Sequence, residues 1–293
     1  MHRHRIVPLL FCALLAAPVA AQPADERPGG DPSDSKLLLA TTTSVRDSGL
    51  LDALLPEFRE RTGIAVQVVA VGSGAALRMG RDGNADALLT HAELGELELV
   101  ASGAAASRTP FMENHLVIAG PPEDPAGVAG AGGPAQALQR IAAAGAPFVS
   151  RGDDSGTHRK EQLLFRLAGL DPEAKWEGFS TTGSGMGLSL QVAGEKRAYV
   201  LSDLGTFLAY RERTELVRLS DEAPPLRNVY AVLRIDPARF EGRVRDAEAR
   251  AFEAFLTRPG TQQRIGEFGR ERYGAPLFRP LLLGETEAGA ASP

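Results

Sequence analysis

Short apolar runs alternate with longer amphipathic stretches along most of the chain. The first three apolar runs are predicted strands, and each is followed by a loop and a helical pattern; they cover Lys36–Ala40, Ile64–Val71 and Ala85–Leu89. The helix after the first strand begins at Leu50, and Pro56 inside it predicts a kink or a split into two turns. Repeated strand–loop–helix units predict an α/β fold with parallel strands covered by helices.

The second half of the chain repeats this alternation. The predicted strands are Met112–Ala119, Pro147–Ser150, Ala198–Leu201, Leu216–Leu219 and Asn228–Ile235. The predicted helices are Pro134–Ala144, His158–Ala168, Asp203–Arg211, Arg243–Leu256 and Pro259–Phe268, and Leu163, Leu164 and Leu167 share one face of the second. The segment 181–187 is predicted to be a flexible loop, and the Pro-, Gly- and Ala-rich segment 120–133 suggests a crossover into a second lobe.

The two ends of the chain differ from the rest. Residues 1–21 resemble a cleavable secretory signal: Arg3 and Arg5 precede the apolar run Ile6–Ala17, and Val19-Ala20-Ala21 forms a small-residue cleavage site. The apolar run is too short to span a bilayer, and nothing longer follows it. Residues 22–36 and 284–293 are predicted to be a disordered leader and a disordered tail. We therefore expect an exported protein of the periplasm.

Charge and cysteine content exclude several classes of protein. The chain has a net charge of −5, and removing Arg3 and Arg5 leaves 30 of its 32 basic residues against 37 acidic ones, a balance of −7. Such a chain is a poor candidate for binding nucleic acid or an anionic membrane. The single cysteine, Cys12, lies in the predicted signal, so a processed chain has no disulfides. An anion bound by this protein must be attracted by local donors.

Three loops that follow predicted strands carry hydroxyl groups beside small residues: Thr41–Ser44, Gly72–Gly74 and Arg151–Thr157. In parallel sheets, ligands bind outside the carboxyl ends of the strands, and the N-termini of the following helices favour anions. The third loop adds Arg151, whose forked donors suit planar or tetrahedral anions. Charge-assisted hydrogen bonds contribute roughly 1.5–3 kcal/mol each. Five or six of them permit tight binding of a small dianion, of order −10 to −12 kcal/mol.

Each loop also has an explanation without a ligand. Helix capping is the better explanation for Thr41–Ser44 taken alone, and Gly72-Ser73-Gly74 is an ordinary turn sequence. The third loop is the strongest candidate, because a cap needs one Ser and not an Arg with two hydroxyls flanking a glycine. We expect Asp153 or Asp154 to orient Arg151. The three loops together favour an anion site more than any one of them does.

Enzyme functions can be tested on the same residues. Ser155, His158 and Asp153 form a nominal hydrolase triad, but no Gly-x-Ser-x-Gly elbow is present. A P-loop is excluded, because no Gly-Lys-Ser/Thr follows Gly72-Ser73-Gly74. The histidines at positions 91, 115 and 158 are too scattered to predict a metal site. We expect no catalytic residues, no cofactor and no metal.

At this point the sequence resembles a known family, the tungstate-binding proteins of bacterial ABC importers, which are close to the phosphate and molybdate binders. The resemblance is carried by Thr41-Thr42-Thr43-Ser44 with Asp47-Ser48-Gly49-Leu50-Leu51, Val71-Gly72-Ser73-Gly74, Ser150–His158 with Lys160-Glu161, and Ala198-Tyr199 with Leu201-Ser202-Asp203. It runs from about Leu37 to about Pro237 and is specific. The Arg-Gly-Asp-x-Ser-Gly-Thr core alone is shared by the wider group of relatives.

The resemblance implies a type II periplasmic binding protein fold with an anion between two lobes and two hinge crossovers. It implies lobe boundaries at 37–118, 119–229 and 230–283. The ligand residues that it implies are Thr42, Thr43, Ser44, Ser73, Arg151, Ser155, Gly156 and Thr157. The implied partners are a tetrahedral oxyanion and a membrane permease, and the protein is expected to be a monomer that closes around its ligand.

Several alternatives stay open from the residues alone. The same fold could bind molybdate, phosphate or sulfate, because tungstate and molybdate are nearly equal in size and charge. Phosphate can carry a proton and needs an acceptor, for which Asp153, Asp154 and Asp86 are available, and Tyr230 could line the cleft. A different class is an exported serine hydrolase using Ser155 and His158. Another is a sensing module that docks on a receptor.

Overall fold

The computed structural model describes residues 35–173 and 175–283. The predicted signal peptide, nearly all of the predicted leader and the predicted tail lie outside these residues. Lys36 was placed both at the end of the leader (22–36) and at the start of the first strand (36–40); it belongs to the strand, because its backbone pairs in register with Ala65. Within the described part of the chain, no helix combines the length and apolar character needed to cross a membrane.

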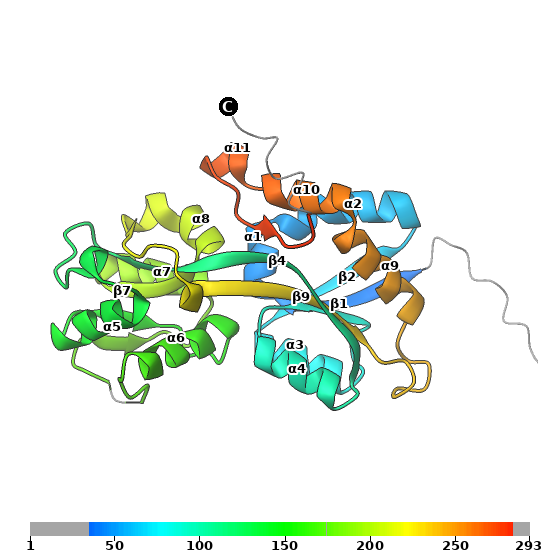
Figure 1. Cartoon of the computed structure of the whole chain (residues 1–293), viewed down its shortest axis with the longest axis horizontal. Coiled ribbons are helices and arrows are strands. Elements are labelled where there is room, and N and C mark those ends of the chain that lie inside the picture. Colours follow the sequence, from blue (N-terminus) through cyan, green and yellow to red (C-terminus); the bar gives the residue numbers. More distant parts are fainter. Residues whose placement is uncertain (1–34, 174, 284–293) are drawn as a thin grey trace, which may run out of the picture.

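The described chain alternates strands and helices over its whole length (Figure 1). The strands are β1 (Lys36–Thr42), β2 (Ala65–Val71), β3 (Ala87–Thr90), β4 (Ala105–Gly120), β5 (Phe148–Ser150), β6 (Phe179–Thr181), β7 (Tyr199–Asp203), β8 (Val217–Arg218), β9 (Arg227–Ile235) and β10 (Arg279–Pro280). The helices are α1 (Thr43–Ser48), α2 (Leu50–Thr62), α3 (Ser73–Arg81), α4 (Glu93–Ala101), α5 (Pro134–Ala143), α6 (Gly156–Leu167), α7 (Met186–Glu195), α8 (Leu204–Thr214), α9 (Asp246–Thr257), α10 (Pro259–Glu267) and α11 (Arg270–Tyr273). Two short 3-10 helices, η2 (Val128–Gly130) and η3 (Pro224–Leu226), complete the described elements.

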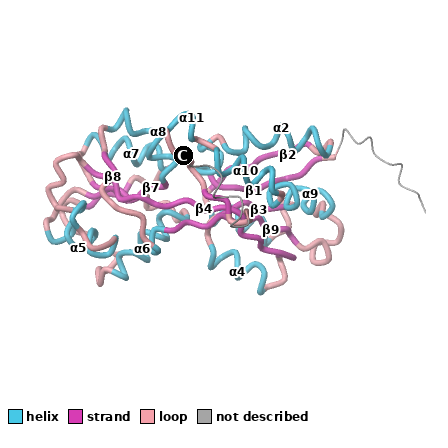
Figure 2. The backbone as a smooth tube through the Cα atoms, turned by 45° about the horizontal axis from the view of Figure 1, so that its top comes forward, coloured by secondary structure: helices cyan, strands magenta, loops and turns pink. Residues whose placement is uncertain are grey.

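The strands lie in the order β2-β1-β3-β9-β4-β7-β5-β6, with β8 and β10 pairing on β4. As predicted, β1 pairs in parallel with β2 and β3, and β5 pairs in parallel with β7. Strand β5 also pairs in parallel with β6, a strand that the sequence did not predict. The long strands β4 and β9 run antiparallel through the middle of the molecule (Figures 1 and 2). Two groups of parallel strands are thus joined by an antiparallel pair.

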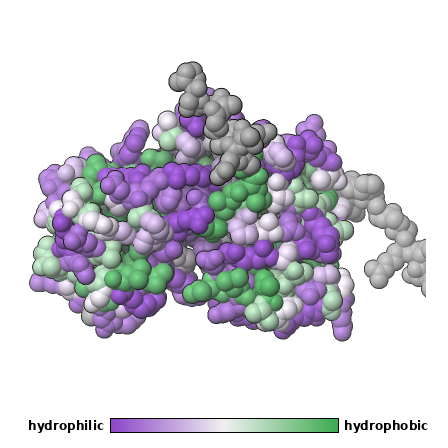
Figure 3. Space-filling view, in the orientation of Figure 1, coloured by the Kyte–Doolittle hydropathy of each residue, from purple (hydrophilic) through white to green (hydrophobic). Residues whose placement is uncertain are grey.

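The hydrophobic cores fall into two groups along the sequence. Two clusters are built from residues between Leu37 and Met112 and between Tyr230 and Phe278, and we call this half lobe 1. Two others are built from residues between Leu116 and Leu226, and we call this half lobe 2. The space-filling view shows the visible face hollowed at its lower centre, where the two halves meet (Figure 3). Each half has its own buried apolar residues, so their relative position depends on the few segments between them.

The chain passes from one group of strands to the other within β4, before the low-complexity segment 120–133 that suggested a crossover. Strand β4 pairs with β9 as far as His115 and with β7 from Leu116, so a single continuous strand passes from one group of strands to the other. The segment 120–133 follows this strand and contains η2. The predicted lobe boundaries at 118/119 and 229/230 remain predictions, although the pairing changes a few residues before the first of them.

Two local predictions on helices were wrong. Pro56 does not split its helix, since α2 runs unbroken from Leu50 to Thr62 and buries Leu54 and Phe58 in lobe 1. Packing of this apolar face outweighs the hydrogen bond that proline removes. On α6, only Leu164 of the three leucines is buried, whereas Leu163 and Leu167 are exposed. The buried face of α6 is completed instead by Glu161 and Phe165.

Candidate functional site

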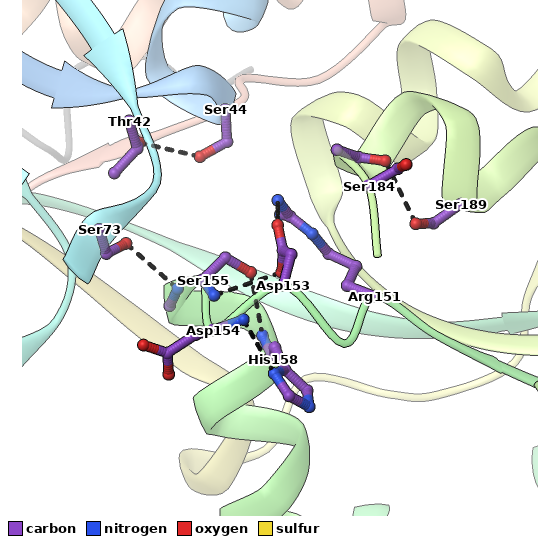
Figure 4. A network of polar contacts seen from close by, with 12 residues as sticks. Thr42, Ser44, Ser73, Arg151, Asp153, Asp154, Ser155, His158, Ser184 and Ser189 are labelled. Atoms are coloured by element: carbon purple, nitrogen blue, oxygen red, sulfur yellow. Dashed lines mark hydrogen bonds and ion pairs between the residues drawn. The ribbon is translucent and has the colours of Figure 1, made fainter. Parts of the chain in front are cut away.

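The three hydroxyl-bearing loops lie where β1, β2 and β5 end and α1, α3 and α6 begin. Two of them are fixed by helix capping, as their sequences indicated. The Thr42 hydroxyl accepts the N–H of Val45 at 3.4 Å, and the Ser155 hydroxyl accepts the N–H of His158 at 3.3 Å. Capping and a ligand site are therefore compatible at these loops. Figure 4 shows the loops facing one another across a small space.

Lobe 1 contributes hydroxyls that already have partners. The side-chain oxygens of Thr42 and Ser44 lie 3.0 Å apart, and both residues are buried. The Ser44 hydroxyl also lies 3.4 Å from Nε2 of His91. Thr43, the first residue of α1, is half-buried. Ser73 begins α3 and is buried. Thr42 and Ser44 thus form a connected polar pair that reaches His91, and Ser73 stands separately at the start of α3.

The two lobes touch directly at this surface. The N–H of Gly156 in lobe 2 donates to the hydroxyl of Ser73 in lobe 1 at 3.1 Å. A Cβ added at Gly156 would lie 2.8 Å from Cε1 of His91 and 3.1 Å from the Ser73 oxygen, closer than side-chain carbons approach such atoms. Only glycine fits here with the lobes in this position. The structure therefore brings the predicted residues of the two lobes together.

Arg151 is the charged group of the site, and its hydrogen-bonding capacity is only partly used. The side chain is buried, and its Nη2 pairs with Oδ2 of Asp153 at 2.5 Å. Its Nε and the hydroxyl of buried Thr157 have no hydrogen-bond partner within the described residues. Buried donors without partners are uncommon and costly, and both a guanidinium N–H and a hydroxyl can donate to an anion. These unmet donors are the strongest structural indication of a ligand.

The neighbouring acids have separate roles. Asp153 orients Arg151, as predicted for one of the two aspartates, and its Oδ1 also accepts the N–H of Ser155 at 3.2 Å. Asp154 pairs with Arg159, and that hydrogen bond, with the charge of Arg159, holds the pKa of Asp154 below its usual value. Asp86 accepts the backbone N–H groups of Leu38 and Arg245 at 2.7 and 2.9 Å and is structural. Only Asp153 of the three candidate proton acceptors belongs to the site.

A serine hydrolase is not assembled here. The Ser155 oxygen is used as a helix cap, and Nδ1 of His158 accepts the backbone N–H of Asp154 at 3.1 Å. Asp153 is bonded to Arg151 and the Ser155 N–H rather than to the imidazole. The Ser–His and His–Asp hydrogen bonds that a triad needs are therefore replaced by others. Among residues 35–173 and 175–283, no group of three or more His, Cys, Asp or Glu side chains could hold a metal ion.

Sequence reasoning missed His91, which joins the site to the crossover strands. Its Nδ1 lies 3.0 Å from Oδ1 of Asn228, and its ring packs on Tyr230 with centroids 4.8 Å apart. Burial lowers the pKa of His91 to about 4, so the imidazole is neutral at pH 7. Tyr230, which we considered as a residue that lines the cleft, contacts His91, and His91 in turn lies beside the Ser44 hydroxyl. The only signal in the sequence was a histidine directly after a strand that ends at the site.

The segment 181–187, predicted to be a flexible loop, is hydrogen-bonded to the backbone of the loop that carries Arg151. The N–H groups of Thr182 and Gly183 donate to the carbonyls of Ser150 and Arg151 at 3.0 and 2.8 Å. The Thr182 hydroxyl lies 2.8 Å from that of Ser189 in α7, which Figure 4 shows on the far side of Arg151. These bonds hold the backbone of the arginine loop, so the segment is part of the site's framework.

A second buried acid lies under the arginine loop. Oε1 of Glu161 accepts a short hydrogen bond of 2.5 Å from the Ser150 hydroxyl, and burial raises the pKa of Glu161 to about 8. Glu161 is therefore largely protonated at pH 7 and adds little negative charge near Arg151. Buried Asp203, which caps α8 through Thr206, also has a raised pKa because of burial. Burial thus raises the pKa of both acids, and protonated Glu161 adds no negative charge beside the arginine loop.

Comparison with known proteins places this chain in a family. Residues 20–259 match the family model described as the PBP superfamily domain. The tungstate-binding protein TupA of Peptoclostridium acidaminophilum is 40% identical over 279 residues, which cover 91% of this chain and 94% of that protein. The chain belongs to the PBP superfamily, in the family of the TupA proteins. Within that family, the PBP fold explains why the hydroxyl loops meet between two lobes.

Solved structures agree with this assignment. The tungstate-binding protein TupA of Desulfovibrio alaskensis G20 is 39% identical, with a TM-score of 0.75 over 85% of this chain and 100% of that chain. The structure described as the tungstate ABC transporter from Geobacter sulfurreducens is 40% identical, with a TM-score of 0.73 over 80% of this chain and 98% of that chain. The predicted α/β, two-lobed periplasmic binding protein fold is confirmed.

Proposed function

We propose that this PBP-superfamily chain is an extracytoplasmic solute-binding protein that captures tungstate between its lobes and delivers it to an ABC importer. The observation that carries the proposal is buried Arg151, whose Nε has no partner among the described residues, beside the unpartnered Thr157 hydroxyl. A tetrahedral oxyanion satisfies both groups. The two TupA proteins described above are 40% and 39% identical to this chain and cover 91% and 85% of it.

The proposed ligand set has two halves. In lobe 2 it consists of Arg151, Ser155, Gly156 and Thr157, and in lobe 1 of Thr42, Thr43, Ser44 and Ser73. Hydroxyls, backbone N–H groups at helix starts and one guanidinium are all donors, and this set favours a fully deprotonated dianion. Because an anion here contacts both lobes, its binding stabilises the arrangement in which Gly156 meets Ser73. No cofactor takes part in this function.

The remaining parts of the proposal concern the protein's surroundings. We assign lobe 1 to residues 37–118 and 230–283 and lobe 2 to residues 119–229. The protein acts as a monomer in the periplasm, exported by the signal at residues 1–21, and its ligand-bound form docks on the membrane permease of the importer. Relatives named as tungstate ABC transporter components support a permease as the partner.

Molybdate is the closest alternative ligand, because its charge and shape are those of tungstate. Sulfate is smaller and has the same charge. Hydrogen phosphate needs an acceptor for its proton, and Asp153 is the candidate acceptor in the site. Its two oxygens already pair with Arg151 and the Ser155 N–H, which makes phosphate the weaker alternative.

A ligand panel tests the proposal. The purified chain without its signal is melted alone and with tungstate, molybdate, sulfate, phosphate or chromate, and hits are titrated by calorimetry. We expect tungstate to raise the melting temperature most, since a ligand that binds only the native state stabilises it by mass action. A larger shift with phosphate, or no shift with any oxyanion, would contradict the assignment.

A further inference from the structure

His91 of lobe 1 lies where the two lobes and the crossover strands meet. It directly follows β3, and its imidazole is half-buried. Its Nε2 lies 3.4 Å from the Ser44 hydroxyl of the first anion loop, and its Nδ1 lies 3.0 Å from Oδ1 of Asn228 on β9. A Cβ added at Gly156 of lobe 2 would lie 3.0 Å from the same Nδ1. Each ring nitrogen therefore has a polar partner, and the ring lies against the start of α6.

The amides of the crossover strands determine which ring nitrogen of His91 carries a proton. The side-chain Nδ2 of Asn228 donates to Oδ1 of Asn114 at 3.0 Å and to the Tyr230 hydroxyl at 3.1 Å. Both protons of this amide are thereby used, and the atom of Asn228 that faces Nδ1 of His91 is Oδ1, which can only accept. Nδ1 is therefore the protonated nitrogen. In the neutral ring, Nε2 then has a lone pair and no proton.

This tautomer decides what the hydroxyls of the first anion loop can do. Because Nε2 of His91 can only accept, the Ser44 hydroxyl is the donor at their contact. A serine hydroxyl has one proton, so Ser44 cannot donate to His91 and to an anion at the same time. The Thr42 hydroxyl is then the donor at the 3.0 Å contact with Ser44 (Figure 4). Neutral His91 thus keeps both hydroxyl protons in bonds within the protein.

A proton on Nε2 of His91 reverses the first of these bonds. Nε2–H then donates to the Ser44 oxygen, and the Ser44 hydroxyl is free to donate to an anion. We infer that His91 is a positioning residue of the anion site, which takes up one proton from solvent at Nε2 when an oxyanion binds and so turns the Ser44 hydroxyl toward the anion. The inference rests on the proposed function, because it concerns how the same site receives its ligand. Solvent can supply the proton, since the ring is only half-buried.

The charges near His91 favour the neutral ring until an anion arrives. Burial and, to a smaller extent, the positive charges of Arg151 and Lys160 in lobe 2 lower the pKa of His91 to about 4. The acids of the arginine loop, Asp153 and Asp154, are already paired with arginines. A dianion between the lobes adds two negative charges beside these cations, and nearby negative charge favours the imidazolium.

Three further titratable groups come from elements packed against His91: Tyr230 of β9, Glu96 of α4 and His158 of α6. Burial raises the pKa of Tyr230, so its hydroxyl is neutral. Glu96 pairs with Arg108 at 2.8 Å, which compensates its charge. Burial lowers the pKa of His158, whose Nδ1 accepts a backbone N–H of its own loop. The bound anion is thus the added charge to which His91 responds.

Calorimetry tests the inference by counting protons. Tungstate at micromolar concentration is titrated into the unmodified protein and into His91→Gln, which can form hydrogen bonds but does not titrate, in two buffers of different ionisation enthalpy at pH 6. We expect the unmodified protein to take up more protons per anion than the variant, by more than about half a proton. Its affinity is expected to gain roughly three- to tenfold more than that of the variant between pH 8 and pH 6. Glu161 titrates in both proteins, so only their difference reports on His91.

His115→Gln is the matched control, because it removes a histidine of β4 that lies 3.5 Å from Glu222. It is expected to match the unmodified protein in proton uptake and, within about twofold, in affinity. NMR of the imidazole nitrogens is a second measurement on the unmodified protein, in which the His91 signals are those kept by both His115→Gln and His158→Gln. We expect a neutral ring protonated on Nδ1 before tungstate is added at pH 6, and an imidazolium afterwards.

Equal proton uptake by the unmodified protein and His91→Gln would overturn the inference. A neutral ring protonated on Nε2, or a ring that stays neutral with tungstate bound at pH 6, would also overturn it. If His91→Gln does not fold, the spectra of the unmodified protein decide alone. Failure of the unmodified protein to bind tungstate would instead overturn the proposed function.

Discussion

The two halves of the anion site differ in how far their polar groups are already satisfied. In lobe 1 the hydroxyls of Thr42 and Ser44 pair with each other, and Ser73 accepts the N–H of Gly156. In lobe 2, buried Arg151 and Thr157 retain donors without partners in the described chain. Unmet donors gain most from a ligand, whereas satisfied ones exchange one bond for another. Lobe 2 is therefore expected to supply most of the affinity, and lobe 1 the surface against which it closes.

The largest loss of tungstate affinity is expected from removing the buried charge of Arg151 in lobe 2. Arg151→Ala is expected to weaken tungstate binding by roughly thirtyfold to a few thousandfold, because loss of one partner from a buried charge pair costs about 2–5 kcal/mol. Calorimetric titration measures the loss. The fold is expected to persist, since the variant also removes a buried cation whose Nε lacks a partner within the described chain.

The matched control is Arg250→Ala, which removes an exposed arginine from α9 that pairs with Asp246 one turn away. Its tungstate affinity is expected to equal that of the unmodified protein. If Arg151→Ala bound as tightly as this control, the assignment of Arg151 as the anion's principal partner would be wrong.

The second largest effect is expected from disrupting the contact between the lobes at Gly156 and Ser73. Gly156→Ala places a methyl group 2.8 Å from Cε1 of His91, so the lobes cannot meet as they do here. Overpacking of this kind costs about 1–3 kcal/mol, which corresponds to roughly a ten- to hundredfold loss of tungstate affinity. Calorimetry measures this, and the melting temperature without ligand is expected to stay nearly unchanged because the clash lies between lobes.

Gly185→Ala is the control for that experiment. Gly185 precedes α7 in the same lobe, and a Cβ there has no other atom within 4 Å. It is expected to leave both affinity and melting temperature unaltered. Equal affinities for the two glycine variants would show that Gly156 does not lie in the binding-competent contact.

The fold could be predicted from sequence wherever hydrophobic periodicity was unbroken. Strands β1, β2 and β9 and the closing helices were located to within a few residues, because their apolar patterns are clear. The first half of β4 was missed, since Pro110 interrupts it; the structure accommodates Pro110 with a register shift against β9. The change of pairing partner within β4, between His115 and Leu116, was not predicted, because a strand that changes partners has no mark in its own sequence.

The candidate site was predictable only where local sequence carries chemistry. Glycine, hydroxyl and arginine residues at strand ends pointed to the three loops, and the structure brings these loops together. His91 and Glu161 were missed, because their importance depends on which distant residues they meet, Ser44 and Asn228 for one and Ser150 for the other. The roles of Asp153 and Asp154 could not be separated from sequence, since only the left-handed turn at Asp154 sends them apart.

The buried acid of lobe 2 yields a prediction for pH. Glu161 has its pKa raised by burial from an ordinary 4.5 to about 8, so between these values the folded protein holds a proton that the unfolded chain has lost. Stability contributed by this group therefore falls as pH rises through that window, by up to about 1.4 kcal/mol per pH unit. Glu161→Gln removes this dependence, and its melting temperature is expected to fall roughly 7–15 °C less between pH 5 and pH 8 than that of the unmodified protein.

Glu195→Gln, at an exposed position on α7, controls for loss of one acid from the same lobe. Its melting temperature is expected to follow the unmodified protein at every pH. A Glu161→Gln variant with the same pH profile as this control would show that Glu161 is ionised in the folded protein.

The smallest effect is expected from removing one hydroxyl of lobe 1. This variant tests directly whether lobe 1 contributes less to the affinity than lobe 2. Ser44→Ala removes a hydroxyl that already lies 3.0 Å from Thr42 Oγ1 and 3.4 Å from Nε2 of His91. Binding an anion exchanges such a bond rather than satisfying an empty donor, so we expect only a two- to tenfold loss of tungstate affinity, in keeping with about 0.5–1.5 kcal/mol for a neutral hydrogen bond. Ser102→Ala, after α4, controls for removal of a serine elsewhere in lobe 1. A loss for Ser44→Ala as large as that for Arg151→Ala would show that the two lobes share the binding energy equally.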